Sequence, residues 1–330
     1  MEKIVKQQNT LSLSNAVMQS IRPHSRTKWE QRRIDVIYTG NIVTTRQLEF
    51  YSPGCPIRRI DKNTYVDIST GEIKPFKHNR KRIDDTASIT KSFANLRNLI
   101  NCNITPETAE NVLFVTLTYA DNMTDQKRLY SDFDKFSKRF RYRYGKFEYI
   151  SVIEPQERGA WHIHAFIIFQ SKAPYIPNTD IAELWKHGFT KTQKIDKNAS
   201  DNMGAYFVAY FTDIETNNEN NVKTVIDKNG DSKRIKKGGR LHLYPVGMHF
   251  YRSSRGVKKP IKKTMTVKNF IGTDICKKYR MTFKKTYDIV THDFCNTLTV
   301  CQYNLSKPKT IQDVINERNI TPCIEDIFND

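Results

Sequence analysis

The stretch of the chain that decides the fold, residues 147–169, reads FEYISVIEPQERGAWHIHAFIIF. Its two ends, residues 147–154 and 161–169, are rich in β-branched and aromatic residues, which predicts two strands. Between them lies a polar stretch with a proline and a glycine, Pro155 and Gly159, which favours a turn. We therefore predict a β-hairpin.

The segments on either side of this hairpin alternate between helix and strand patterns. Apolar residues recur every three or four positions in the helical segments, whereas β-branched residues dominate the strands. The predicted elements are a helix over 84–100, a strand over 112–119, a helix over 125–143, a short helix over 180–186, a strand over 189–195 and a helix over 201–212. From residue 112 onward, the order βαββαβα predicts an α+β fold, an antiparallel sheet with helices on one face.

The chain of 330 residues carries a formal net charge of +19, from 54 Lys and Arg against 35 Asp and Glu. An excess of this size attracts a polyanion, and nucleic acid is the first candidate partner. No run approaches the roughly 18 apolar residues of a membrane-spanning helix, and the six cysteines include no C-x-x-C pair. We expect a cytoplasmic protein with reduced thiols and no membrane partner.

The cationic residues are concentrated in one region. Residues 231–290 hold 17 Lys and Arg against 3 Asp and Glu, among aromatic residues such as Tyr244, Phe250 and Tyr251. Cations mixed with aromatic rings suit the backbone and bases of single-stranded DNA, although a solvated basic extension has the same composition. The candidate DNA-binding residues are Lys236, Lys237, Arg240, Arg252, Arg255, Lys258 and Lys259.

These patterns suggest three parts. Residues 1–83 combine strand-like pieces with turn signals and form an N-terminal extension, residues 84–260 form the catalytic domain, and residues 261–330 form a basic C-terminal extension. Within the domain, residues 217–239 are polar and turn-rich, which predicts a mobile insertion.

A candidate metal site lies in the hairpin. His162 and His164 are two positions apart in an apolar strand, so both imidazoles point to the same face. Glu154 ends the preceding strand, and any pairing of even with even positions puts its carboxylate beside them. Burying two imidazoles is unfavourable unless their nitrogens find partners, which favours ligation over simple packing. We predict that Glu154, His162 and His164 bind Mg²⁺ or Mn²⁺, although zinc hydrolases use the same ligand types.

A candidate nucleophile lies in the last predicted helix. Tyr206 and Tyr210 are four positions apart and share one helix face. A phenol loses its proton near pH 10, so it becomes a useful nucleophile only where a neighbour such as a metal site favours phenolate. Tyrosines at this spacing are also common in cores, so the residues alone leave catalysis and packing open.

Three segments in this order resemble the motifs of the HUH superfamily of rolling-circle replication initiators, found on small bacterial plasmids and single-stranded DNA phages. Residues 114–119, FVTLTY, resemble the first motif, Glu154 with the sequence WHIH at 161–164 resembles the second, and Tyr206 with Tyr210 resembles the third. The resemblance covers roughly residues 84–260. It implies a ferredoxin-like (RRM-like) sheet core, a divalent cation, and a tyrosine that nicks a replication origin and stays joined to the cut 5′ end.

One position departs from the family pattern. A lysine usually follows a tyrosine of the third motif by three residues, but Ala209 and Asp213 occupy those positions here. Either another lysine takes this role, such as Lys186 or one beyond residue 231, or cleavage is weakened or lost. The sequence also lacks G-x-x-x-x-G-K-[ST], so host helicase and polymerase are expected partners. Two alternatives remain open, a non-catalytic origin-binding or regulatory protein on the same fold, and a transposase or relaxase with the same chemistry.

Overall fold

The chain is a mixed α+β protein with antiparallel sheets and several helices, and it forms two compact units. We call residues 78–259 the central unit and residues 1–77 together with 260–330 the terminal unit. The computed structural model describes residues 29–50, 57–68, 70–76, 86–156, 159–197, 202–212, 214–215, 223–226, 232–236, 244–245, 248–290, 295–311 and 313.

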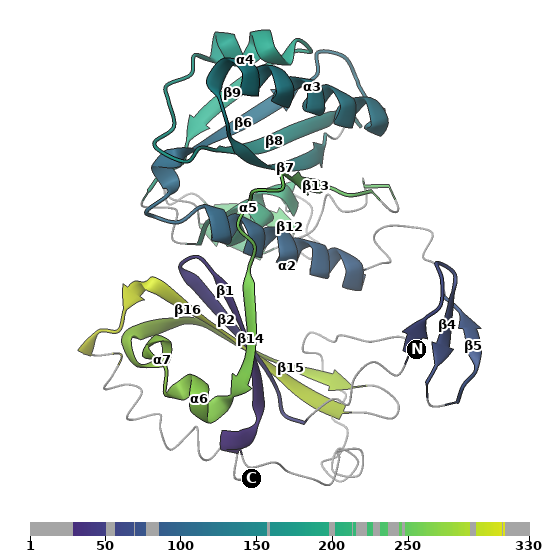
Figure 1. Cartoon of the computed structure of the whole chain (residues 1–330), viewed down its shortest axis with the longest axis vertical. Helices are drawn as coiled ribbons and strands as arrows, with labels where there is room; N and C mark the ends of the chain where they lie inside the picture. The colour runs from purple at the N-terminus through teal and green to yellow at the C-terminus, as the bar shows by residue number, and fades with distance from the viewer. Residues whose placement is uncertain are drawn as a thin grey trace. The chain divides into compact units, whose positions relative to one another are not determined.

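The central unit is built on a five-stranded antiparallel sheet with the strand order β13-β7-β8-β6-β9 (Figure 1). The predicted hairpin is confirmed as β7 and β8, and the predicted strands on either side of it are confirmed as β6 and β9. Because β6 and β8 are neighbours, the two strands of the hairpin and the first strand pair without a break. The bounds are β6 (Val112–Thr118), β7 (Glu148–Pro155), β8 (Trp161–Ile168), β9 (Thr190–Lys194) and β13 (Tyr251–Ser253).

All four predicted helices of this unit are confirmed, and α3 shows why they form. Asp125 caps its first turn by accepting from the backbone N–H of Lys127 at 2.8 Å, and the helix ends at Gly145, whose φ is +82°. Its apolar stripe packs on the sheet through Leu129, Phe133, Phe136 and Phe140. The bounds are α2 (Thr86–Asn103), α3 (Gln126–Tyr144), α4 (Asn178–Trp185) and α5 (Met203–Thr212).

The expectation that the helices cover one face of the sheet is wrong, because they cover both. Phe133 of α3 packs edge-on against Tyr149 of β7, with ring centres 5.1 Å apart. Phe207 of α5 instead contacts Phe114 and Phe166, which face the other way, at 4.7 and 4.6 Å. Figure 1 shows α3 and α4 on one side of the sheet and α2 and α5 on the other.

The reason lies in the central strands, which are apolar on both faces. In β8 the five residues from Ile163 to Ile167 are all buried, so neither face can be left to solvent. Near-continuous apolar runs of this kind occur in strands that are covered on both sides, whereas a sheet covered on one side alternates between apolar and polar residues.

A close helix contact fixes the position of α5. Gly204 lies so near α2 that a Cβ atom there would collide with the carbonyl oxygen of Arg97. Its backbone N–H donates to Oδ1 of Asn101 at 2.7 Å. The first turn of α5 is therefore held against α2, and only glycine permits this approach.

The terminal unit joins the two predicted extensions in one five-stranded antiparallel sheet with the strand order β14-β1-β2-β16-β15. Strands β1 (Arg33–Thr39) and β2 (Ile42–Leu48) come from the N-terminal part, and β14 (Ile261–Thr266), β15 (Tyr279–Val290) and β16 (Cys295–Pro308) come from the C-terminal part. Helices α6 (Val267–Ile271) and α7 (Asp274–Lys278) accompany them. Its small core contains Ile34, Val36, Val43, Val267, Phe270 and Tyr303.

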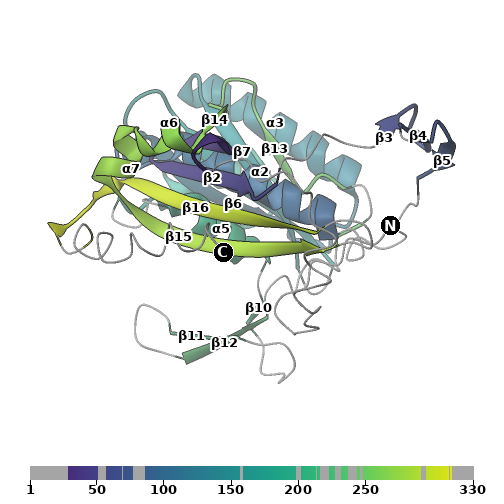
Figure 2. The same ribbon diagram turned by 90° about the horizontal axis from the view of Figure 1, so that it is seen from below.

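Two smaller sheets complete the described structure. One consists of β3 (Ile57–Arg59), β4 (Thr64–Asp67) and β5 (Ile73–Pro75), and the other of β10 (Ile214–Glu215), β11 (Lys223–Ile226) and β12 (Ser232–Lys236) (Figure 2). Strands β11 and β12 therefore occupy part of the interval 217–239, which was expected to be an irregular loop. None of the helices in the described part of the chain is long and apolar enough to cross a membrane.

Candidate active site

The three predicted metal ligands lie on one face of the central sheet. Glu154 of β7 stands directly opposite His162 of β8, so the predicted pairing of even with even positions is confirmed. His164 follows on the same face, with Thr116 of β6 as its neighbour on the other side. The hairpin register thus starts all three side chains from adjacent backbone positions.

Glu154 and His164 are in direct contact. Oε2 of Glu154 lies 2.5 Å from Nε2 of His164, and both residues are buried. On the other side of the ring, Nδ1 lies 3.2 Å from the hydroxyl oxygen of Thr116. The ring of Phe114 stacks on the imidazole at 5.6 Å with an angle of 6°. The His164 imidazole is therefore held at both nitrogens and on one ring face.

Burial sets the charge of His164. Because an imidazolium would lose its water in this site, burial lowers the pKa of His164 from 6.5 to about 4. The ring is therefore neutral at pH 7, which is the form that ligates metal ions. The contact with Thr116 orients the ring so that Nε2 faces the carboxylate of Glu154.

The third predicted ligand is near but not in the same cluster. His162 is half-buried, and its ring centre lies 6.3 Å from that of His164. Among the residues that the structure describes, no three His, Cys, Asp or Glu side chains are grouped closely enough to hold a metal ion. The structure thus brings Glu154 and His164 together and sets His162 beside them on the same face.

The two predicted nucleophiles lie on α5, which covers this face. Phe207 points into the core, whereas the adjacent Tyr206 is 58% exposed, with its ring 5.2 Å from that of Phe207. Tyr206 is therefore at the surface of the covering helix rather than packed inside it. Tyr210 belongs to the same helix, but its side chain lies outside the described residues.

The structure also bears on the missing lysine of the third motif. Ala209 is exposed on α5, and Asp213 lies outside the described residues. Lys186, the named substitute, lines a hollow with Lys138, Arg139 and other residues of α3. Because α3 covers the face opposite to that of His164, Lys186 is not on the histidine face.

The candidate DNA-binding residues have different surroundings. Arg252 lies over the ring of Tyr130 at 5.0 Å and forms an ion pair with Asp134 at 3.4 Å, so it ties β13 to α3. Arg255, Lys258 and Lys259 are exposed, as predicted for residues that meet DNA. The side chain of Lys236 and all of Lys237 and Arg240 lie outside the described residues.

Two aromatic residues expected to stack on DNA instead belong to the core. Tyr244 is buried, and its hydroxyl donates to the carbonyl oxygen of Ile153 at 2.7 Å. Phe250 is buried as well and stacks on Phe93 of α2 at 4.4 Å. Their position after the catalytic motifs suggested an extension, but β13 returns to the edge of the sheet and brings them into the central core.

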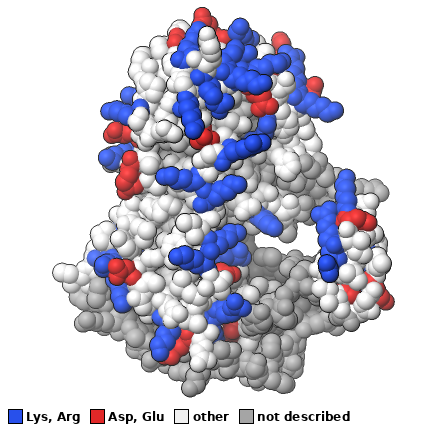
Figure 3. Space-filling view, in the orientation of Figure 1, with Lys and Arg blue, Asp and Glu red and all other residues white. Residues whose placement is uncertain are grey.

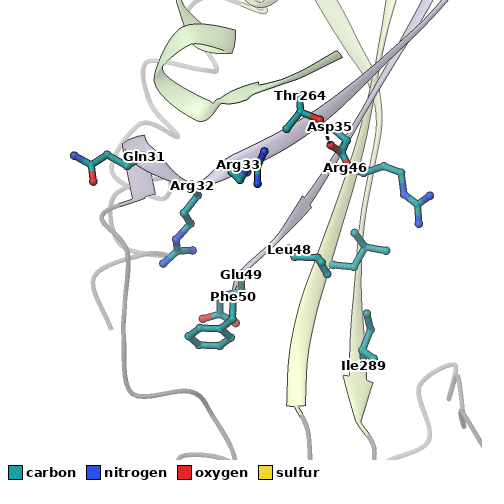
Figure 4. Close-up of a pocket in the computed structure, with 11 residues that line it drawn as sticks. Gln31, Arg32, Arg33, Asp35, Arg46, Leu48, Glu49, Phe50, Thr264 and Ile289 are labelled. Atoms are coloured by element: carbon teal, nitrogen blue, oxygen red, sulfur yellow. Dashed lines mark hydrogen bonds between the residues drawn. The ribbon is translucent and has the colours of Figure 1, made fainter. Parts of the chain in front are cut away.

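Other charged surfaces were not singled out from the sequence. Figure 3 shows Lys and Arg gathered at the top of the view, over α3 and α4. In the terminal unit, Arg32, Arg33 and Arg46 line a hollow together with Asp35 and Glu49 (Figure 4). This hollow contains none of the predicted site residues. Periodicity predicted the helix α3 but gave no sign that its cations would face a common hollow.

An α+β unit with a buried Glu–His pair on a central hairpin, and a tyrosine helix over the same sheet face, fits a protein that processes nucleic acid. Residues 112–215, from β6 to β10, match the family of Replication-associated protein ORF2, and this part of the chain belongs to that family of phage and plasmid replication proteins. The resemblance to such proteins in the three sequence motifs is thereby confirmed. No curated protein and no solved structure matches the chain.

Proposed function

We propose that this protein starts rolling-circle replication by nicking one DNA strand at an origin. A tyrosine of α5, Tyr206 or Tyr210, is the nucleophile, and Glu154, His162 and His164 hold a divalent cation, Mg²⁺ or Mn²⁺. The observation that carries the proposal is the contact between the buried Glu154 carboxylate and the neutral His164 ring on the sheet face that the tyrosine helix covers.

The residues present suit a divalent cation. A buried carboxylate needs a positive or proton-bearing partner, and Nε2 of His164 supplies one at 2.5 Å. The donor set of two imidazole nitrogens and a carboxylate oxygen is a common one for catalytic metals with open positions. When bound, the cation would polarise the scissile phosphate and reduce the charge that develops on it.

The chemistry of the tyrosine balances without a further reactant. The phenolic oxygen forms a bond to phosphorus as the bond from phosphorus to the 3′ oxygen breaks. The phenol gives up its proton, and the leaving 3′ oxygen gains one. The 5′-phosphotyrosine that results keeps the energy of the phosphodiester, so the 3′ hydroxyl can later rejoin the strand. The exposed position of Tyr206 leaves its hydroxyl open to such a substrate.

The strand order of the central sheet supports the ferredoxin-like core. Counting β6, β7, β8 and β9 as strands one to four, the order is two, three, one, four, so the first and third strands are neighbours in the middle. This is the split βαβ arrangement of ferredoxin-like folds. The net charge of +19 supports single-stranded origin DNA as the partner in the cytoplasm of a bacterial host, with unwinding and synthesis by host helicase and polymerase.

The test is a cleavage assay on a labelled origin strand with Mg²⁺ or Mn²⁺. The expected product is a covalent protein–DNA adduct that resists denaturation and fails to form with a chelator. The variants are Tyr206→Phe, Tyr210→Phe and the double substitution, and Tyr142→Phe is the matched control because Tyr142 is 96% exposed on α3. An adduct that survives the double substitution would refute the assignment of the nucleophile.

A second candidate is an origin-binding or regulatory protein without cleavage activity. It is favoured by Ala209, which is exposed on α5 where the family pattern has a lysine. Origin binding that needs no metal and leaves the strand uncut would support it. A transposase or relaxase would give the same adduct as an initiator, and the two differ in the DNA to which the cut end is joined.

A further inference from the structure

The edge strand β9 leaves part of the histidine face open. On β6 and β8 this face is covered by α5, because Phe114 and Phe166 are buried against Phe207. On β9 the residues of the same face are Phe189, Lys191 and Gln193, and all three are exposed. The sheet therefore carries an uncovered ledge beside the candidate active site. We call these three residues the β9 ledge.

The strand register aligns this ledge with the histidines. Lys191 is the Cα partner of Thr116, and Thr116 is the partner of His164. One residue pair further along, the backbone N–H of Thr118 donates to the carbonyl oxygen of Phe189 at 2.9 Å, and Thr118 is the partner of His162. Each histidine thus has one member of the ledge two strands away.

The distance across the sheet suits a polymeric substrate. Neighbouring strands lie about 4.8 Å apart, so Lys191 and His164 start from Cα positions about 10 Å apart. Thr116 between them is small, and its hydroxyl turns towards Nδ1 of His164. A strand of DNA whose phosphate sits at the histidines can therefore reach the ledge with the adjacent nucleotide.

The backbone before Phe189 is held firmly. Gly188 has a φ of +145°, and a Cβ atom there would lie 2.5 Å from the backbone nitrogen of Ala120. The carbonyl oxygen of His187 accepts from that same nitrogen at 2.8 Å. Phe189 is therefore presented by a rigid turn, although its side chain is 66% exposed.

The composition of the ledge indicates its ligand. A lysine on an edge strand can be explained by protection against aggregation, but a large exposed phenylalanine has the opposite effect. An aromatic ring beside a cation is instead the combination that binds single-stranded nucleic acid, by base stacking and by phosphate contact. We propose that the β9 ledge is a single-stranded DNA subsite, where Phe189 stacks on a base and Lys191 contacts a phosphate.

This inference deepens the proposed nickase function and offers a place for the cation that Ala209 and Asp213 do not supply. Lys191 lies on the histidine face, unlike Lys186. Its role would be to position the strand, because its backbone lies two strands from His164.

The test measures binding rather than cleavage. Fluorescence anisotropy with a labelled thymidine homopolymer in the presence of a chelator reports affinity without metal or nicking. Phe189→Ala should weaken binding by about 5- to 100-fold, and Phe189→Trp should restore it. Lys191→Gln should weaken binding several-fold and lower the logarithmic salt slope by about 0.7.

Matched controls separate the ledge from general charge. Lys194→Gln removes a lysine from the same strand, whose residue pairs with Leu113 and faces the other side of the sheet. Tyr142→Ala removes an exposed aromatic ring from α3. Binding losses equal to those of the ledge variants in both controls, or no loss in either ledge variant, would overturn the proposal.

The subsite and the nickase can fail separately. If no variant or condition gives a covalent adduct but binding still depends on Phe189 and Lys191, the subsite stands and the nickase does not. If wild-type protein forms the adduct while Phe189→Ala and Lys191→Gln bind as it does, the nickase stands and the subsite does not.

Discussion

The two five-stranded sheets of this chain differ in how they are covered. The central sheet is buried on both faces, so that Phe114 meets α5 while Tyr149 meets α3. The terminal sheet is one-sided, because in β1 Ile34 and Val36 are buried and the alternate residue Asp35 is exposed. The same strand number and the same antiparallel pairing therefore produce one sandwiched layer and one open layer.

The difference teaches where chemistry and where binding can occur. Only a covered sheet removes enough water to keep His164 neutral and in contact with Glu154. An open sheet instead displays charge, as Lys262 and Lys263 do on β14. We expect changes in the central sheet to affect stability and cleavage, and changes in the terminal sheet to affect attraction to DNA.

The largest expected effect is on stability. Phe166→Ala removes a fully buried ring from the central sheet and should lower the free energy of unfolding by about 3 to 5 kcal/mol. Phe283→Ala on β15 removes a ring that is 41% exposed and should cost much less. Chemical denaturation of both variants gives the two values. Equal losses would show that the two sheets are not covered as differently as described.

The next effect is a pH dependence of stability in metal-free protein. The folded pKa of His164, about 4, lies below its ordinary value of 6.5, so the unfolded chain takes up a proton first as the pH falls. Stability should therefore be complete above pH 6.5 and decrease between pH 6.5 and 4, by up to about 3 kcal/mol. Denaturation with a chelator at several pH values measures this, and His164→Gln should lose this part of the slope.

A smaller effect is expected on cleavage when one ligand is removed. Glu154→Ala should reduce metal-dependent nicking by about 100-fold, because even residues behind metal ligands often contribute 10- to 100-fold. Asp35→Ala is the matched control in the terminal sheet, where Asp35 accepts from the hydroxyl of Thr264 at 2.7 Å. Rates should be compared at saturating DNA. A similar loss in both variants would remove the distinction between the sheets.

The smallest effect is expected from single cations of the terminal sheet. Lys262→Gln or Lys284→Gln should weaken DNA binding only a few-fold, because each side chain is exposed and screened. Each phosphate contact that is lost should lower the logarithmic salt slope by about 0.7 to 0.9. Binding at several salt concentrations gives this slope, and an unchanged slope would show that DNA does not use this sheet.

The sequence predicted the central unit well because its signals are local. The hairpin turn between Pro155 and Gly159, the even spacing of His162 and His164, and the apolar stripe of α3 each lie within a short stretch. The register that pairs Glu154 with His162 follows from the short hairpin connection.

What could not be predicted depends on contacts between distant segments. The terminal sheet pairs β2 with β16, so Val43 meets Tyr303 across most of the chain, and no local pattern indicates such a pairing. The β9 ledge is open only because α5 stops short of the edge strand, which no periodicity of residues 189–195 reveals. Tyr244 and Phe250 have the composition of a DNA-binding extension and are buried only because β13 pairs with β7.

The most direct test of the central claim is Mn²⁺ binding to the whole protein, followed by electron paramagnetic resonance. We predict a bound Mn²⁺ signal in wild-type protein that disappears in Glu154→Ala, His162→Ala and His164→Ala. The signal should persist in His249→Ala, which removes an exposed histidine of the same unit. Wild-type protein that binds no Mn²⁺, or three ligand variants that bind it as wild type does, would contradict the account.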